Sequence, residues 1–337
     1  MNLSPLAIWF RELKRDLPWR NNPTPYAVWI SEMMLQQTQV KTVIPYFERW
    51  MIRFPDVETL ANASIEEVIK LWEGLGYYSR ARYIHESARK LVALGFKTIT
   101  EEALPHIKGL GPYTRGALLS FAFKKRAAAV DGNVLRVMSR LSLFEGDVSS
   151  PRSREHIEKV VLHALPQEKP WETMEALIEL GATLCKKNPE CLKCPLLGQC
   201  KAFKQGKQLE LPVKKKGPAI TKLDRTVLII ESERGFLVKK GKKGKIMADL
   251  YEFPWIEGHD EMKVEALILE QFGEFTELTK LEKVSHGFTR YQATLFPYRI
   301  RLKSKYSGEY DWHNDLEALP FSSGHKRIRA FLTGSAR

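Results

Sequence analysis

The chain is predicted to contain two domains of different class: an all-α domain over residues 1–203 and an α+β domain over residues 225–337. In the first part, apolar residues recur at spacings of three and four, which is the periodicity of a helix. In the last part, short runs of β-branched and aromatic residues are bounded by turn residues, which is typical of strands. From residue 201 to 222, seven lysines stand against a single glutamate. This change in composition predicts a basic linker over residues 204–224, either a solvated tether or a segment that follows phosphates.

The charge of the chain is strongly positive. It contains 53 lysines and arginines against 40 acidic residues, which gives a net charge of +13 and a pI near 9.4. Such an excess indicates a polyanionic partner, nucleic acid first, with a generally basic protein as the alternative. The first residues lack the basic and apolar regions of a signal peptide, and no apolar run is long enough to span a membrane. We therefore expect a cytoplasmic monomer with no membrane partner.

Prolines and one capping residue mark the ends of the helices predicted in the first domain. Boundaries are expected at Pro18, Pro25, Pro55 and Pro105. Ser64 is the expected N-cap of a helix that starts with Ile65, Glu66 and Glu67, because its hydroxyl can accept from a free backbone amide. Apolar residues at helical spacing include Ala27, Ile30 and Met34; Val43, Phe47 and Trp50; and Ile157, Val160 and Val161.

The helix predicted from Pro25 to Val40 carries Glu32 with apolar residues one turn before and after it. Burial in a partly apolar wall would raise the pKa of this carboxyl group. A glutamate that stays protonated near neutral pH can act as a general acid, an effect of roughly 10² to 10⁴ in rate. The alternative is an exposed glutamate on an apolar helix. Gln37 and Thr38 are expected to be polar residues of the same helix.

Two short runs, residues 107–114 and 130–136, hold the other candidate groups. In the first, Gly109 and Gly111 flank one apolar residue, which favours a tight turn with uncovered amides that could bind an anion. An ordinary corner between helices is the alternative. In the second, Asp131 stands before a helix and is an expected N-cap. We expect a carboxylate there to stay ionised, as stabilisation of a sugar cation requires.

All four cysteines of the chain lie within sixteen residues, at Cys185, Cys191, Cys194 and Cys200. In an intracellular protein this clustering predicts a metal site rather than disulfides. Both zinc and a 4Fe-4S cluster accept four thiolates.

Together, the run with Gly109 and Gly111 and the run with Asp131 resemble the helix-hairpin-helix and Gly-Pro-Asp signature of the DNA glycosylase superfamily. Within it, the chain looks most like the adenine glycosylases of the MutY type, over nearly its full length. The resemblance implies that the two glycines' amides grip a DNA phosphate and that Asp131 faces the anomeric carbon of the target nucleotide. The stretch from Glu32 to Gln39 matches the same family, in which this glutamate protonates adenine; relatives of the endonuclease III type lack it.

The resemblance also implies roles for further residues. Bifunctional relatives have a Schiff-base lysine at the position of Tyr113, so the tyrosine predicts a monofunctional enzyme that leaves an abasic site. Asn133 is expected beside Tyr113 at the sugar, and Glu175 is a candidate adenine reader, with a surface i,i+4 pair as its alternative. The remaining residues expected to bind the DNA substrate are Trp19, Arg20, Gln37, Thr38, Leu75 and Tyr77, of which Tyr77 is the expected wedge in the base stack.

For the cysteines, the superfamily's spacing, with Cys194-Pro195 at the third ligand, favours a 4Fe-4S cluster over zinc. The gap between Cys185 and Cys191 holds five residues, one fewer than is usual in the family. The expected role of the cluster is to order the basic loop around it against the DNA backbone.

The second domain is similar to the Nudix-related C-terminal domain of the MutY family, notably at residues 250–254. Glu265, Glu270 and Glu274 do not have the spacing of a metal-binding Nudix helix, so the domain is interpreted as a binding module. The family's Phe-Ser-His loop, which recognises 8-oxoguanine, corresponds here to Phe288, Thr289 and Arg290. Thr289 keeps the hydroxyl group of the family's serine. Arg290 replaces the family's histidine, whose ring is titratable, with a permanently charged side chain.

The resulting hypothesis is a base-excision repair enzyme that acts on double-stranded DNA and removes adenine mispaired with 8-oxoguanine or guanine. Three alternatives stay open at this point. The first is an endonuclease III-like lyase acting on oxidised pyrimidines, which Glu32 and Tyr113 oppose. The second is a catalytically silent mismatch-binding protein. The third is a Nudix-type nucleotide hydrolase, which the missing carboxylate helix disfavours.

Overall fold

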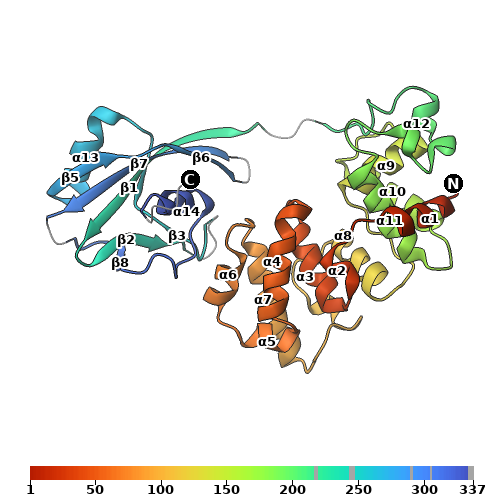
Figure 1. Ribbon diagram of the computed structural model, residues 1–337, viewed down its shortest axis with the longest axis horizontal. Coiled ribbons are helices and arrows are strands. Elements are labelled where there is room, and N and C mark those ends of the chain that lie inside the picture. The colour runs from red at the N-terminus through yellow and green to blue at the C-terminus, as the bar shows by residue number, and fades with distance from the viewer. Residues whose placement is uncertain (216–218, 243–246, 289–290, 304–305, 333–337) are drawn as a thin grey trace. The chain divides into compact units, whose positions relative to one another are not determined.

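A computed structural model of the chain describes residues 1–215, 219–242, 247–288, 291–303 and 306–332 (Figure 1). The chain divides into two compact units. The helical unit contains Met1–Ala63 and Tyr83–Lys216, and the sheet unit contains Ser64–Arg82 and Gly217–Arg337. The predicted all-α and α+β classes are confirmed by the helices of the first unit and the sheet of the second. Unlike the predicted bounds, the structure groups residues 64–82 with the C-terminal part.

The first part of the chain is helical throughout. Its elements are α1 (Ser4–Leu13), α2 (Pro18–Asn21), α3 (Pro25–Leu35), α4 (Val40–Arg53), α5 (Val57–Asn62), α6 (Ile65–Trp72), α7 (Ser79–Ala93), η1 (Leu104–His106), α8 (Pro112–Ala117), η2 (Leu118–Ala122), α9 (Gly132–Ser142), α10 (Pro151–Ala164), α11 (Pro170–Thr183), η3 (Cys191–Lys193), η4 (Leu197–Gln199) and α12 (Lys201–Lys204). Of these, α6 belongs to the sheet unit, and η2 is a π-helical turn that continues α8.

Two of the predicted helix starts are confirmed by their caps. The Ser64 side chain accepts from the Glu67 amide at the start of α6, and the Asp131 side chain accepts from the Val134 amide at the start of α9. The predicted end of the helix that carries Glu32 is wrong. Helix α3 ends at Leu35, and Gln37 has a φ of 58°, which an α-helix cannot contain. Gln37 and Thr38 therefore lie in a turn after α3 and not on it.

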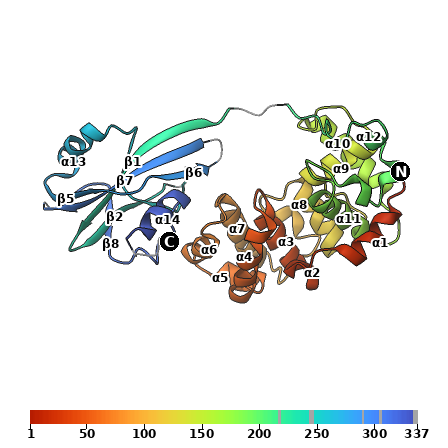
Figure 2. The same ribbon diagram turned by 45° about the horizontal axis from the view of Figure 1, so that its top comes forward.

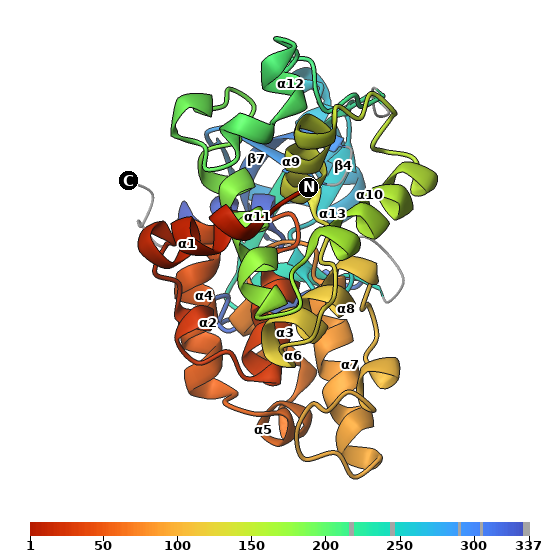
Figure 3. The same ribbon diagram turned by 90° about the vertical axis from the view of Figure 1, so that its right-hand side faces the viewer.

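Helix α3 is the buried centre of the helical unit. All residues from Tyr26 to Met34 are buried, so the helix is covered on every side. Glu32 is buried with them, at 6% exposure. Helix α11 lies beside α1 and α9 (Figure 3). A Cβ atom on Gly181 of α11 would lie 2.6 Å from the Asn133 Cβ, so only glycine lets α11 approach the start of α9 this closely.

The sheet unit is built on a mixed sheet. Its strands are β1 (Thr221–Ser232), β2 (Gly235–Lys240), β3 (Tyr251–Glu252), β4 (Trp255–Glu257), β5 (Phe275–Lys280), β6 (Val284–Phe288), β7 (Tyr291–Leu302) and β8 (Asp311–His313), with η5 (Glu261–Lys263), α13 (Val264–Phe272) and α14 (Ser323–Ala330). The main path has the order β3-β2-β1-β7-β5. Strands β1 and β7 run parallel, side by side (Figure 2). Strand β6 pairs antiparallel with the first part of β7.

Both faces of the central strand are covered. Val227 and Ile229 of β1 pack in a core that includes Ile328 of α14, whereas Leu228 and Ile230 pack in a second core with α13. This arrangement explains why β1 is a continuous apolar run instead of an alternating one. Helices α13 and α14 therefore lie on opposite faces of the sheet. In the part of the chain that the structure describes, no helix has the length and apolar character needed to cross a membrane.

A single methyl group at Gly116 should destabilise the helical unit. A Cβ atom there would lie 1.9 Å from the Ala128 carbonyl oxygen, so the Gly116→Ala substitution forces backbone to move. We expect the free energy of unfolding to fall by about 1–3 kcal/mol. Urea denaturation followed by circular dichroism would measure it. The matched control is Gly132→Ala, whose Cβ would have no atom within 4 Å, and equal midpoints for the two variants would contradict the prediction.

Candidate active site

A cavity of about 240 Å³ opens in the helical unit. One water molecule takes about 30 Å³ in the liquid, so the cavity can admit a group much larger than water. Among the residues that line it are Trp19, Arg20, Glu32, Tyr113 and Glu175. Five of the predicted site residues, from four segments of the sequence, therefore meet at one cavity.

Glu32 reaches this cavity from the buried helix α3. Its Oε2 atom is buried and has no hydrogen-bond partner among the residues that the structure describes. Burial raises the pKa of Glu32 to about 7, the neighbouring Tyr113 hydroxyl lowers it in part, and the charge of Asp131 raises it further. The carboxyl group can therefore hold or release a proton near neutral pH, which is what general acid–base chemistry requires.

Asp131 is held rigidly at the start of α9. Its Oδ1 accepts from the Val134 amide and its Oδ2 accepts from the Asn133 side-chain amide, both at 2.8 Å. Burial outweighs these bonds and raises the pKa of Asp131 above its ordinary value. Asn133 in turn accepts from Arg136 at 2.9 Å. Burial and the charges of Glu32 and Asp131 raise the pKa of Tyr113 well above its usual value, so its hydroxyl keeps its proton.

A buried ion-pair network holds Glu175. Arg20 Nε lies 3.2 Å from Glu175 Oε2, and the Arg20 Nη2 donates to Glu179 Oε2 at 2.9 Å. The Glu179 side chain is fully buried and also accepts from Arg15 Nε at 2.6 Å and Nη2 at 2.9 Å. Glu175 therefore pairs across helices and not with a surface neighbour on α11. Burial raises the pKa of Glu175, whereas the two arginines lower the pKa of Glu179.

Three residues at this site were missed by sequence reasoning. For the Arg15–Glu179 pair, the sequence contains one signal. Glu179 stands four residues after Glu175, so a second acidic residue lies on the same face of a mostly apolar helix. Lys124 gave none. It lines the cavity with a left-handed backbone (φ 57°), and its ammonium donates to the Phe121 carbonyl at 2.7 Å. Burial lowers the pKa of Lys124.

The predicted anion-binding turn leads into α8. Gly109 has a φ of 81°, and a Cβ there would lie 2.8 Å from the Tyr83 ring, so the turn requires glycine. Gly111 is in extended backbone and is the N-cap of α8, which has no side-chain cap. Its own amide donates to the Gly109 carbonyl at 3.0 Å. The amides of the first turn of α8, which has no capping side chain, can therefore bind an external acceptor.

The glycine-rich bend of the sheet unit presents one of its two predicted residues. Tyr77 is 48% exposed with a φ of 48°, whereas Leu75 is 5% exposed. Arg80 fixes the bend from inside, because its Nη2 donates to the carbonyls of Leu75 and Gly76 at 3.1 and 2.9 Å. Tyr77 is thus offered to solvent on a fixed backbone while Leu75 packs in the interior.

The four cysteines line one small cavity, together with Arg140. Arg140 is almost fully buried, and its Nη1 donates to Cys185 Sγ at 3.3 Å and to the Lys186 carbonyl at 2.6 Å. Within the described ranges, no three histidine, cysteine or acidic side chains converge as they do around a single metal ion.

Of the predicted lesion-binding residues, the structure describes only the backbone of Phe288. It is the last residue of β6, where it pairs with Tyr291 of β7. The other two, Thr289 and Arg290, lie outside the described residues. In the same unit, Glu265 and Glu270 lie on α13 and Glu274 follows it, and no metal-binding set of the described residues includes them.

Comparison with known proteins places both parts of the chain in recognised groups. Residues 30–162 match the family model described as HhH-GPD superfamily base excision DNA repair protein. Residues 225–330 match the NUDIX domain model.

Curated relatives extend the match over most of the chain. The adenine DNA glycosylase of Mus musculus is 44% identical over 214 residues, which is 60% of this chain and 42% of that protein. The adenine DNA glycosylase of Buchnera aphidicola subsp. Acyrthosiphon pisum (strain APS) is 31% identical over 319 residues, covering 94% of this chain and 87% of that protein. The chain thus spans less than half the length of the mouse protein and most of the bacterial one.

Among solved structures, a trapped covalent intermediate of endonuclease III with DNA is similar to this chain. The TM-score is 0.52 with 25% identity, covering 60% of this chain and 94% of that one. The described helices of the first unit therefore have the fold of a protein that was solved bound to DNA.

Burial of Glu32 should make stability depend on pH. Because its pKa is raised from 4.5 to about 7 in the folded chain, stability is fully present below pH 4.5 and falls as pH rises through 7, by about 3 kcal/mol. Glu32→Gln cannot ionise, so this variant should be more stable than the wild type at pH 8 and equal to it at pH 4.5. Thermal denaturation from pH 4.5 to 8.5 would measure the difference. Glu58→Gln, at an exposed position, is the control, and an unchanged pH profile in Glu32→Gln would refute the prediction.

Proposed function

The chain belongs to the adenine DNA glycosylase family, and from this premise we propose that it removes adenine mispaired with 8-oxoguanine or guanine from double-stranded DNA. The reaction is hydrolysis of the N-glycosidic bond, and the product is an abasic site. The observation that carries the proposal is Glu32, a buried carboxyl group with a pKa of about 7 and an unpartnered oxygen at a cavity that can admit a base. A base stacked in the duplex cannot reach such a site, so the adenine must be flipped out of the helix.

The cavity wall supplies groups suited to a flipped purine. Trp19 offers an aromatic surface, and the Glu175 carboxylate can accept from the exocyclic amine of adenine. Arg20 lies between Glu175 and Glu179, which fixes the orientation of the Glu175 carboxylate. Guanine would present a carbonyl oxygen to Glu175 where adenine presents the amine, and two acceptors repel.

Cleavage then needs a proton on the base and a stabilised sugar. Glu32 donates its proton to N7 of adenine, the C1′–N9 bond breaks, and the electron pair leaves with the base. Asp131 faces the oxocarbenium-like sugar and stabilises its positive charge, as an anion or as a covalent ester. Water then adds to C1′ and gives its proton to the Glu32 carboxylate. Tyr113 and Asn133 hold the geometry through their contacts with Glu32 and Asp131.

Tyr113 limits the reaction to base removal. A bifunctional glycosylase needs a lysine amine to form a Schiff base with C1′, and a phenol cannot do so. The strand is therefore expected to stay intact until alkali cuts the abasic site.

Binding of the duplex is assigned to groups outside the cavity. Amides at the Gly109–Gly111 turn and the first turn of α8 bind a phosphate, with the helix dipole behind them. Tyr77 wedges into the base stack from a fixed backbone with Leu75 packed beneath the bend, and Gln37 and Thr38 contact the strand opposite the adenine. The base opposite the adenine is read by the sheet unit through Phe288, Thr289 and Arg290.

A 4Fe-4S cluster is proposed as the occupant of the cysteine cavity. The thiols of Cys185, Cys191, Cys194 and Cys200 line this one cavity, and each would bind one iron of the cluster. Arg140 and Arg136, both on α9, fix the loop by donating to the carbonyls of Lys186 and Cys185. The helix that Asp131 caps therefore also anchors the cysteine loop, and the cluster would order its basic residues for phosphate contact.

Excision under single-turnover conditions tests the function. We expect adenine to be lost from duplexes with adenine opposite 8-oxoguanine and opposite guanine, and not opposite thymine, with strand breaks only after alkali. Glu32→Gln should slow excision by about 10² to 10⁴. In the wild type the rate should fall about tenfold per pH unit well above pH 7, because the protonated form of Glu32 is consumed.

The controls for excision separate the alternatives. Glu158→Gln, at a half-exposed position of α10, should behave as the wild type. Strand cleavage without alkali together with trapping by borohydride would instead indicate a lyase. A preparation that binds the duplex but releases no adenine would overturn the proposed activity.

Metal analysis of the purified chain tests the cluster. We expect about four iron atoms per chain and a brown colour, both lost in Cys194→Ser. Loss of the cluster should also lower the melting temperature, because the loop held by Arg140 loses its core. One zinc ion per chain in place of iron would contradict the assignment.

A further inference from the structure

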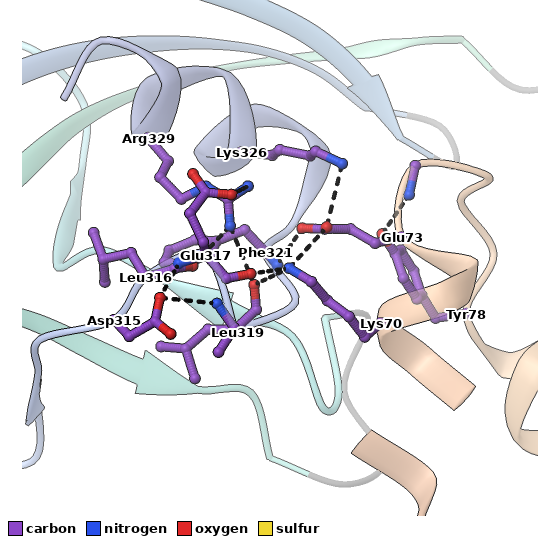
Figure 4. Close-up of polar contacts among 12 residues, drawn as sticks. Lys70, Glu73, Tyr78, Asp315, Leu316, Glu317, Leu319, Phe321, Lys326 and Arg329 are labelled. Atoms are coloured by element: carbon purple, nitrogen blue, oxygen red, sulfur yellow. Dashed lines mark hydrogen bonds and ion pairs between the residues drawn. The ribbon is translucent and has the colours of Figure 1, made fainter. Parts of the chain in front are cut away.

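Glu73 is a buried carboxylate at the junction between α6 and the glycine-rich bend, and two of its partners lie 248 and 253 positions along the chain. Its Oε1 accepts from the Phe321 amide at 2.9 Å, and its Oε2 accepts from Lys326 Nζ at 3.2 Å (Figure 4). Lys70 Nζ lies 3.3 Å from the same oxygen. Glu73 is 6% exposed, so this is a desolvated carboxylate with charged partners. Removing one member of such a pair costs far more than breaking a surface ion pair.

Other contacts hold the same two segments together inside the sheet unit. Lys70 Nζ donates to the Leu319 carbonyl at 3.1 Å and to the Glu317 carbonyl. Arg82, at the far end of the bend, donates to the Ala248 carbonyl at 3.1 Å and pairs with Asp249 at 3.2 Å. Residues 64–82 are therefore attached to the rest of the unit on both sides of the bend. Among the charged side chains named in these contacts, Glu73 is the most buried.

On one side, Glu73 is joined directly to the bend that presents Tyr77. The Gly74 amide donates to the Tyr78 hydroxyl at 3.1 Å, and the Trp72 indole donates to the Gly76 carbonyl at 3.1 Å. With Arg80 holding the intervening carbonyls, the backbone from Glu73 to Tyr77 has little freedom to move independently. A displacement of Glu73 is therefore transmitted to Tyr77.

On the other side, Glu73 is joined through α14 to strand β6. Lys326 belongs to α14, and a Cβ on Gly324 of the same helix would lie 2.6 Å from His286 Nε2, so α14 is in close contact with β6. Arg327 of α14 also donates to the Ser285 carbonyl of β6 at 3.0 Å. Strand β6 ends at Phe288, the first of the residues assigned to reading the opposite base.

We propose that Glu73 is a positioning residue that couples the Tyr77 bend to α14 and β6, so that wedging into the base stack and reading of the opposite base take place in one rigid step. This inference rests on the proposed function and adds to it the group that sets the preference for 8-oxoguanine over guanine. With Glu73 in place, contact with the lesion at β6 stabilises the inserted position of Tyr77. Without it, adenine is still cleaved, but contact with the lesion no longer assists insertion.

Single-turnover excision from duplexes with adenine opposite 8-oxoguanine and opposite guanine tests the coupling in the full-length, cluster-loaded chain. Glu73→Ala should lower the rate ratio between the two duplexes about tenfold, which is the effect expected for a lost hydrogen bond to a charged group. Glu73→Gln keeps an acceptor for the Phe321 amide, so its ratio should be intermediate. The control is Glu261→Gln, which breaks an exposed ion pair with Lys280 in the same unit and should leave the ratio unchanged. An unchanged ratio in Glu73→Ala would overturn the inference.

A second readout follows Tyr77 without depending on cleavage. 2-Aminopurine placed beside the base opposite adenine reports unstacking by fluorescence when the chain binds. In the wild type the signal should rise more with 8-oxoguanine than with guanine, and this difference should be lost in Glu73→Ala and in Lys326→Met, which removes one partner at a half-exposed position. If Glu73→Ala does not fold, as judged by its melting curve, Glu73→Gln and Lys326→Met decide the question, and wild-type differences in both would refute the coupling.

Failure of the proposed function and failure of the Glu73 inference give different experimental results. If the wild type excises no adenine, the proposed function is wrong whatever the variants do. If the wild type excises adenine with a preference for 8-oxoguanine, and the variants keep both that preference and the fluorescence difference, only the role of Glu73 is wrong.

Discussion

Burial of one carboxyl group, that of Glu32, is the constraint on which the helical unit depends. Helix α3 is covered on all sides, so Glu32 can stay in it only by holding a proton or by bearing a large desolvation cost. The raised pKa of Glu32 has two consequences. It lowers the stability of the unit at high pH, and it lets Glu32 act as an acid at neutral pH.

Three further carboxylates show how local partners separate the roles of acids on one site. Glu179 has two arginines and a lowered pKa, which makes it a permanent anion that orients Arg20. Glu175 has one close arginine and a raised pKa, and Asp131 has backbone and amide donors that burial outweighs. Environments that push pKa values apart are the usual way in which one site assigns acid and base functions. Burial outweighs the single close arginine of Glu175, whereas the two arginines of Glu179 outweigh its burial.

The sequence predicted what local pattern determines and missed what long-range pairing determines. Burial of Glu32, the cap at Asp131 and the gathering of the cysteines followed from neighbours in the chain. The ion pair from Arg15 to Glu179 joins residues 164 positions apart, and the bond from Phe321 to Glu73 joins residues 248 apart, so no local pattern contains them. Strand β8 and helix α14 were not predicted, because they are short and polar. The end of α3 was wrong because a left-handed residue, Gln37, has no distinctive sequence signature when it is not glycine.

An enzyme of the proposed kind faces a discrimination that its cavity cannot supply. Adenine opposite thymine and adenine opposite 8-oxoguanine are the same base once flipped out, so Glu32, Glu175 and Arg20 contact both in the same way. Selectivity must therefore arise before or during flipping, from groups that contact the opposite strand, and it can reach the chemistry only if those groups affect the flipped population. If the residues that contact the opposite base were joined to Tyr77 by a flexible segment, the difference in binding free energy between 8-oxoguanine and thymine would not reach the flipping step. Under the proposed coupling, the buried attachment through Glu73 is the connection that would preserve this difference.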